Sequence, residues 1–168
     1  MKLNVAEQLK LAGKAKHAEL EAELGPFFYG GRTVAFASPV RMHVDYVYDG
    51  DCFQVSGRLE TELASECALC GKAFAEPFGF SFSERFKKDT SEEDDAYEYR
   101  GEELDLGRMA EELIFLNLPL SSVCAEDCKG LCPVCGCNLN TAQCSCAGDG
   151  LINPFLTLGA LRNVDKEV

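Results

Sequence analysis

The chain has 168 residues, of which 46% are apolar, and its formal net charge at pH 7 is −12. This length and composition predict one domain, spanning 1–168, with a real core, and exclude two large domains. The charge argues against direct binding of DNA or RNA, because counterion release on nucleic acid requires clustered Lys and Arg. An acidic protein suits a basic partner better, and ribosomal proteins are an abundant basic class.

The first residues, MKLNVAEQLKLAGK, lack the uninterrupted apolar stretch of a secretory signal. Nothing later approaches the roughly 20 apolar residues that a membrane span requires. We therefore expect a cytoplasmic protein that does not enter a membrane. In a reducing cytosol the ten cysteines are better explained as metal ligands than as a disulfide framework.

The N-terminal part of the chain, 1–104, predicts a β-rich core. Partial helical spacing of apolar residues predicts a short helix within 1–24, before the pattern changes to a period of two. Alternation predicts strands over 40–48 and 53–63, which the turn at Asp49, Gly50 and Asp51 joins as a hairpin.

A third strand comes next, with four phenylalanines on one side, so that Cys67 and Cys70 fall at the tip of a second hairpin. The charged span 87–96 predicts an exposed acidic loop, whose simplest interpretation is a solvated surface. A helix over 105–117 should cover the sheet, and Pro154 in the first turn predicts a last helix over 153–163.

Seven cysteines fall within 123–148, in the run CAEDCKGLCPVCGCNLNTAQCSC. Thiolates two or three residues apart can face one point across a tight turn, which suits a tetrahedral ion. Cys132, Pro133, Val134, Cys135 and Gly136 form a knuckle of this kind. The segment therefore predicts a metal-binding module, and a closed site made only of sulfur favours zinc in a structural role.

Iron and redox chemistry are the alternatives. The spacing of Cys128, Cys132 and Cys135 matches that of radical S-adenosylmethionine enzymes, but the large barrel of those enzymes requires far more chain than the residues after Cys135. An iron–sulfur cluster without that chemistry remains open, because cysteine ligands alone do not separate zinc from iron. Cys67 and Cys70 could be a thiol redox pair, although such pairs begin a helix and these two lie between strands.

Two cysteines stand apart from the predicted ligands. Cys52 directly follows a turn and has no cysteine near it, and Cys137 breaks the two-knuckle pattern. Eight candidate ligands remain, the number that two four-thiolate ions require, although a single zinc ion is the simpler alternative. One partition places four around each ion: Cys67, Cys70, Cys124 and Cys128 for the first, and Cys132, Cys135, Cys144 and Cys146 for the second.

Catalysis has little support in the sequence. His17 and His43 are the only histidines, and neither belongs to a recognisable triad. A zinc ion with four sulfur ligands has no open position for water. We therefore expect no enzymatic activity.

The order of these motifs resembles the YceD family. The resemblance rests on the Cys67 pair, the start of the helix at Asp105 and Leu106, the stretches LNLPLSSVC, CKGLCPVCGCNLN and NPFLTLGAL, and the pair Cys144 and Cys146. It implies a bacterial, non-enzymatic factor for the synthesis, processing or stability of 23S ribosomal RNA. Its partner would be a ribosomal protein or a large-subunit assembly intermediate.

The implied fold class is α+β: an antiparallel sheet, a covering helix and a C-terminal cysteine-rich zinc-binding module. In metal-binding members of this family, the eight candidate ligands recur. A cysteine at position 137, where a polar residue is expected, departs from that pattern. An iron–sulfur or thiol redox protein, or a zinc protein that binds nucleic acid directly, is the alternative function.

Overall fold

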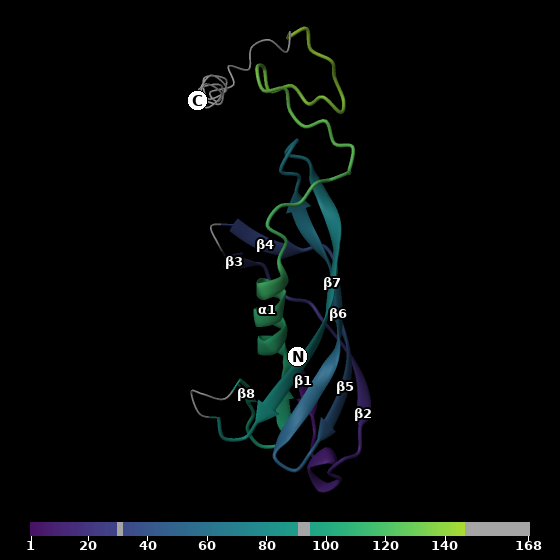
Figure 1. Cartoon of the computed structure of the whole chain (residues 1–168), viewed down its shortest axis with the longest axis vertical. Helices are drawn as coiled ribbons and strands as arrows, with labels where there is room; N and C mark the ends of the chain where they lie inside the picture. Colours follow the sequence, from purple (N-terminus) through teal and green to yellow (C-terminus); the bar gives the residue numbers. More distant parts are fainter. Residues whose placement is uncertain (30–31, 91–94, 147–168) are drawn as a thin grey trace, which may run out of the picture.

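The computed structural model describes residues 1–29, 32–90 and 95–146. Strands dominate this part of the chain, and a single α-helix comes after them (Figure 1). In chain order the elements are β1 (Lys2–Asn4), a 3-10 helix (Gln8–Lys10), β2 (Lys16–Ala22), β3 (Phe27–Tyr29), β4 (Arg32–Phe36), β5 (Val40–Tyr48), β6 (Cys52–Glu66), β7 (Ala73–Lys87), β8 (Tyr97–Glu98), β9 (Glu103–Asp105) and α1 (Leu106–Asn117).

The long hairpin of β6 and β7 organises the sheet. Each strand has 15 residues, and their antiparallel register runs from Cys52 opposite Lys87 to Glu66 opposite Ala73. The other edge of β6 pairs with β5 and, farther along, with β4. The hairpin of β5 and β6 and the third strand, both predicted from period-two alternation, are confirmed.

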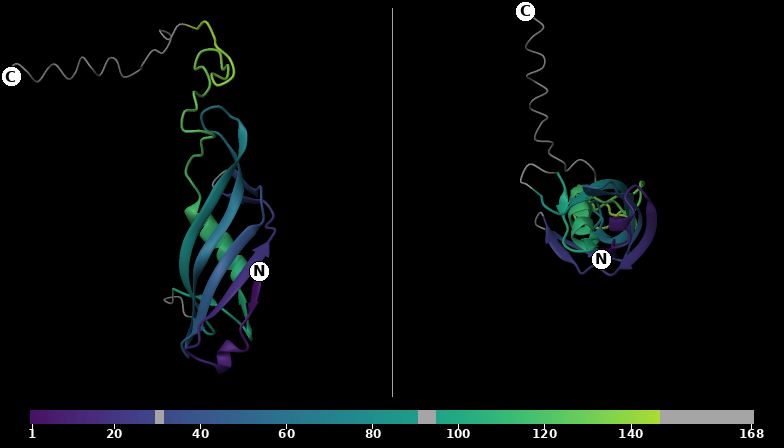
Figure 2. Two further views of the ribbon diagram at one scale, coloured as in Figure 1. Left: turned by 90° about the vertical axis from the view of Figure 1, so that its right-hand side faces the viewer. Right: turned by 90° about the horizontal axis from the view of Figure 1, so that it is seen from below.

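Alternation along the strands places the core on the face of the sheet that α1 covers. Val40, Met42 and Val44 of β5 are buried, whereas the residues between them are exposed. They share one cluster with the apolar side of α1, to which Met109 and Ile114 belong. Viewed along the long axis, the strands curve around the helix (Figure 2, right). The predicted covering helix is therefore confirmed.

The helix begins where the sequence places its start. Asp105 is its N-cap, and Oδ1 of Asp105 accepts hydrogen bonds from the backbone N–H groups of Gly107 (3.1 Å) and Arg108 (3.4 Å). A carboxylate that accepts from the first free N–H groups of a helix is a favourable cap. Leu104 lies just before it, in β9, which pairs with β1.

The prediction of a short helix within 1–24 is wrong for most of that segment. The segment forms β1, a single 3-10 turn and β2, which pairs antiparallel with β5. In β2 the half-buried residues alternate with exposed ones, as in other strands. Because β2 is a short, charged edge strand, this alternation gives only a weak period of two in the sequence. Pairing with the exposed edge of β5 outweighs the local helical preference.

Other boundaries differ in detail. Lys87, the first residue of the expected acidic loop 87–96, is the last residue of β7, and 91–94 lie outside the described residues. The helix expected over 153–163 also lies outside them. Within the described ranges, no helix is long and apolar enough to cross a membrane.

The tip of the β6–β7 hairpin projects beyond the rest of the sheet (Figures 1 and 2). The chain that leaves α1 runs along the molecule to this tip and continues past it as the cysteine-rich segment. The two parts of the chain that contain Cys-x-x-Cys pairs therefore meet at one end of the molecule.

Candidate metal centres

The tip of the hairpin is a tight knuckle formed by 67–71. The N–H of Gly71 donates to the carbonyl of Cys67 (2.8 Å), and the N–H of Cys67 donates to the carbonyl of Lys72 (2.9 Å). Gly71 has φ = +69°, a conformation that glycine adopts without strain. This backbone curl places the cysteines at both ends of the turn on the same side.

The knuckle 132–136 repeats this geometry. The N–H of Gly136 donates to the carbonyl of Cys132 (2.8 Å), and the N–H of Cys132 donates to the carbonyl of Cys137 (2.8 Å). Gly136 has φ = +71°. Two segments far apart in the sequence thus form the same turn, which is typical of paired thiolate ligands.

The chain after α1 passes on both sides of the first knuckle. The N–H of Ala68 donates to the carbonyl of Ser122 (2.8 Å), and the N–H of Leu131 donates to the carbonyl of Leu69 (3.0 Å). Gly130 lies against Leu69, because a Cβ at Gly130 would stand 3.1 Å from the Leu69 carbonyl oxygen. These contacts hold the cysteines at 124 and 128 beside the tip.

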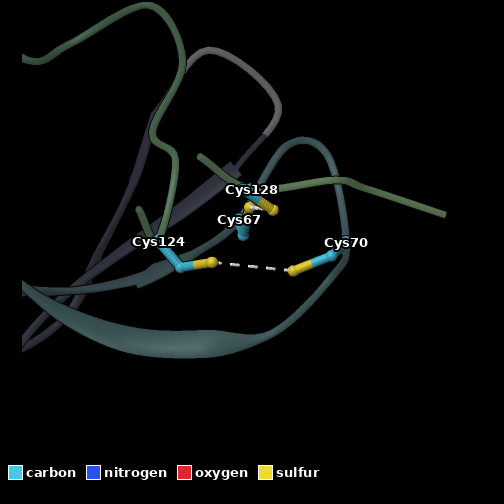
Figure 3. Close-up of side chains that lie close together, drawn as sticks. All are labelled: Cys67, Cys70, Cys124 and Cys128. Carbon is cyan, nitrogen blue, oxygen red and sulfur yellow. Dashed lines mark hydrogen bonds between the residues drawn. The ribbon is translucent and has the colours of Figure 1, made fainter. Parts of the chain in front are cut away.

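The first centre contains Cys67 and Cys70 from the hairpin and Cys124 and Cys128 from the segment after the helix. All four side chains point toward one region (Figure 3). Their Sγ atoms lie within 4.8 Å of one another, with 3.8 Å between Cys67 and Cys128 and 3.7 Å between Cys70 and Cys124. Cys67 and Cys70 are buried, and the other two are half-buried.

These separations fit a single tetrahedral ion. Four thiolates about 2.3 Å from zinc lie about 3.8 Å from one another, which agrees with both measured distances. A disulfide would bring two sulfurs to about 2.05 Å, and all ten cysteines are free. A cluster of several irons would spread its ligands farther apart than one ion does.

The second centre contains Cys132, Cys135, Cys144 and Cys146, whose Sγ atoms also lie within 4.8 Å of one another. Cys132 is buried, Cys144 and Cys146 are half-buried, and Cys135 is exposed. Two groups of four therefore form, with the membership predicted from the sequence. The second centre is the more exposed of the two.

Backbone N–H groups favour ionised sulfur at the first cysteine of each knuckle. Hydrogen bonds from the N–H groups of Cys124, Leu69 and Cys70 lower the pKa of Cys67 to about 6. Those of Cys135 and Val134 lower the pKa of Cys132 to about 6. A hydrogen bond to the charged form lowers a pKa, so each centre has at least one thiol that readily becomes a thiolate.

Two other ligand thiols, Cys124 and Cys146, show what a bound cation would supply. Burial, followed by the neighbouring sulfurs, raises the pKa of Cys124 to about 12. At Cys146, hydrogen bonding with Cys135, together with burial, raises the pKa to about 12. Four like charges so close together cannot all form unaided, whereas a divalent ion at their centre would stabilise all four thiolates.

The two cysteines set aside in the sequence belong to neither group of four. Sγ of Cys52 donates to Oδ2 of Asp49 (3.3 Å) in the β5–β6 turn, at the opposite end of β6. Cys137 holds the position in the second knuckle that Lys72 holds in the first, since each accepts through its carbonyl from the first cysteine. This backbone role does not require a thiol, but the side chain of Cys137 also hydrogen-bonds with Cys135 and Cys144 of the second centre.

The three cysteines with radical-enzyme spacing do not share a site. Cys128 belongs to the first centre, and Cys132 and Cys135 belong to the second. The pair Cys67 and Cys70 lies between two antiparallel strands, without the helix N-terminus that activates a redox thiol. The geometry thus supports neither radical S-adenosylmethionine chemistry nor a thiol redox role for Cys67 and Cys70.

Asn140 supports the first centre and could not be identified from ligand spacing. Its Nδ2 donates to Sγ of Cys128 (3.4 Å), and its Oδ1 accepts from the backbone N–H of Lys129 (2.9 Å). Outer partners of this kind orient a ligand and tune its basicity. The sequence signal is weak: a polar residue shortly after the second knuckle.

Replacing Asn140 with alanine should weaken the binding of a metal ion such as zinc at the first centre by about 10-fold, the lower end of the usual effect of outer-shell changes. Competition with a chromophoric chelator measures this affinity. Gln143→Ala, at an exposed position of the same segment, is the control and should change it by less than about twofold. Equal effects of the two changes would contradict the role of Asn140.

A family model matches the part of the chain that forms this arrangement. Residues 55–162, more than half of the chain, match the family described as large ribosomal RNA subunit accumulation protein YceD. The chain belongs to the YceD family. Both cysteine centres, most of the β6–β7 hairpin and α1 lie within the matched residues.

Relatives in plants and mycobacteria are similar to parts of the chain. Large ribosomal RNA subunit accumulation protein YCED homolog 1, chloroplastic, of Arabidopsis thaliana is 24% identical over 157 residues, which cover 74% of this chain and 49% of the relative. An uncharacterized protein of Mycobacterium tuberculosis is 34% identical over 88 residues, which cover 49% of this chain and 42% of the relative. The chain spans about half the length of these curated relatives. No solved structure gives a significant match.

Proposed function

We propose that this member of the YceD family is a non-enzymatic, zinc-binding factor of ribosome biogenesis that supports the synthesis, processing or stability of 23S ribosomal RNA. The family match carries the proposed role in ribosomal RNA accumulation, and the pair of four-cysteine centres, one of which joins the chain after α1 to the tip of the β6–β7 hairpin, carries the zinc assignment. The proposal places this work in the cytoplasm.

Zinc is the ion that we assign to both centres. Four thiolates at these separations suit a closed tetrahedral site, in which no position is left for water or substrate. Bound zinc would supply a cross-link: at the first centre it would hold Cys124 and Cys128 against the hairpin, and at the second it would close the loop from Cys132 to Cys146. Its contribution is then to folding.

The cleft next to the first centre supports a non-enzymatic role. It has a volume of about 490 Å³ and lies between β4, β6 and the segment 118–122. Glu66 is the only ionisable side chain among its described lining residues. Nucleophilic catalysis usually pairs a nucleophile with an activating base in hydrogen-bond reach, and one glutamate offers little for such a mechanism.

The charge of the chain supports a basic protein partner. Its net charge is −12, and within the cysteine-rich segment the lone Lys129 is outnumbered by Glu126 and Asp127. Four thiolates around one zinc ion would add further negative charge. Such a surface attracts a ribosomal protein or a protein-rich assembly intermediate and repels RNA phosphates.

Fractionation of ribosomal particles tests the proposal. The protein should co-sediment with precursors of the large subunit, and raising the salt concentration should release it, because exposed charges are screened. Depletion should lower the ratio of 23S to 16S ribosomal RNA, and the unaltered gene should restore it. Absence of co-sedimentation together with an unchanged ratio would overturn the proposal.

A further inference from the structure

The two histidines of the chain lie next to each other on the outer face of the sheet. Their strands, β2 and β5, pair antiparallel, with His17 opposite Asp45 and Glu19 opposite His43. The imidazole rings are stacked, with centroids 6.4 Å apart and planes 19° from parallel. All four side chains are exposed, on the face that points away from α1.

A carboxylate oxygen lies between the two rings. Oε1 of Glu19 is 3.7 Å from Nε2 of His17 and 3.4 Å from Nδ1 of His43. Ligand atoms of these three residues all lie within 4.8 Å of one another. Two of the three come from β2 and one from β5, so the paired strands fix their relative positions.

Those distances suit ligands of one ion better than they suit hydrogen bonds. A nitrogen–oxygen hydrogen bond measures about 2.7–3.2 Å, and both contacts of Glu19 are longer. Two ligand atoms bound to one tetrahedral ion at about 2.0–2.1 Å lie about 3.3 Å apart. Small rotations of these exposed side chains would bring all three to that spacing.

Asp45 supplies the second independent observation. Its Oδ1 lies 3.0 Å from Nδ1 of His17, which is hydrogen-bond distance, so this nitrogen carries the proton and donates it. The lone pair of His17 is then on Nε2, the atom that faces Glu19. A carboxylate that orients a histidine in this way is the usual outer partner of a metal ligand.

We propose that His17, Glu19 and His43 form a third metal site, which binds a divalent transition ion such as zinc, with Asp45 as its outer-shell partner. Two imidazoles and one carboxylate select zinc over calcium or magnesium, which prefer oxygen ligands. The site is open: three protein ligands leave a position for water or for a group of a partner molecule.

This site is separate from the cysteine centres. His43 pairs with Arg58 of β6, and Cys67 comes nine residues later, about 30 Å farther along an extended strand. The cysteine centres are therefore too far away to share His17, Glu19 or His43 as ligands. The proposal does not depend on the assigned role in ribosome biogenesis.

Nitrogen-15 NMR of the histidine rings tests the proposal directly. Full-length protein whose cysteine centres are saturated with zinc is titrated with further zinc sulfate. Because the chain has two histidines, we expect both sets of ring signals to shift together and to saturate at one additional ion. His17 should bind through Nε2, with Nδ1 still protonated.

Matched variants on β2 separate a site from general charge. Glu19→Gln should weaken this additional binding at least about 10-fold, and Asp45→Asn should weaken it by about 10-fold as an outer-shell change. Glu21→Gln removes the same charge two residues away, where Oε2 of Glu21 contacts Arg41 (3.2 Å), and should change it by less than about twofold. Equal affinities for the two glutamate variants, or histidine signals that do not respond to zinc, would overturn the proposal.

Discussion

Replacing Cys67 with serine should lower the content of tightly bound, sulfur-ligated zinc from two ions per chain to one. Cys67 is buried at the tip of the hairpin, its thiol has a pKa lowered to about 6, and its sulfur lies 3.8 Å from that of Cys128. Removing one of four thiolates from a structural site abolishes most of its affinity, which is on the order of 10 kcal/mol for zinc bound by short peptides. Elemental analysis of the purified protein measures the loss.

The same change should release the chain after α1 from the hairpin. The N–H groups of Ala68 and Leu131 donate across this junction, so their hydrogen exchange should become much faster in Cys67→Ser. The amides of β5 should keep their protection, because the hydrophobic cluster between sheet and helix contains none of the cysteines. Mass spectrometry after deuterium labelling distinguishes these segments.

Cys52→Ser is the matched control. Cys52 is also buried and lies on the same strand as the hairpin tip, but at its other end, and its sulfur contacts Asp49 rather than another sulfur. This variant should retain two zinc ions. A Cys67→Ser protein with two ions, or a Cys52→Ser protein with one, would contradict the assignment of the first centre.

The second centre should lose its ion first when a chelator competes for zinc. Cys135 is exposed, and within this group only Cys132 is buried, whereas the first centre has two buried ligands. Solvent access to the sulfurs lets a chelator attack while the ion is still bound. We therefore expect two phases of zinc release, and Cys132→Ser should remove the fast phase and one ion.

Cys137→Ser is the control for the second centre. Cys137 accepts a hydrogen bond through its backbone carbonyl, and serine preserves that bond. The variant should release two ions in two phases, as the unaltered protein does. Loss of the fast phase in Cys137→Ser, with its retention in Cys132→Ser, would show that Cys137 is a ligand in place of Cys132.

The sequence predicted those parts of the fold whose signals are local. Alternation identified β5, β6 and β7 because one face of these long strands is buried or half-buried and the other is exposed. Asp105 marked the start of α1, of which it is the N-cap. Both groups of four match the one partition of the cysteines that the sequence suggested beside a single-ion alternative. Pairs two or three residues apart readily share an ion, and the hairpin pair needed partners from elsewhere.

Features that depend on contacts between distant segments could not be predicted. β2 is short, charged and at the edge of the sheet, so its period is weak, and the expected helix was wrong. The proximity of His17 to His43 results from the register of β2 on β5, which no local pattern reveals. Likewise, the equivalence of Cys137 and Lys72 appears only when the two knuckles are compared as structures.

X-ray absorption at the zinc edge, combined with elemental analysis of purified protein, tests the central claim most directly. Two structural centres predict two zinc ions per chain, each surrounded by four sulfur atoms at about 2.3 Å. The protein should be colourless. One ion per chain, nitrogen or oxygen in the average coordination of the tightly bound ions, or iron with visible absorption would contradict the claim.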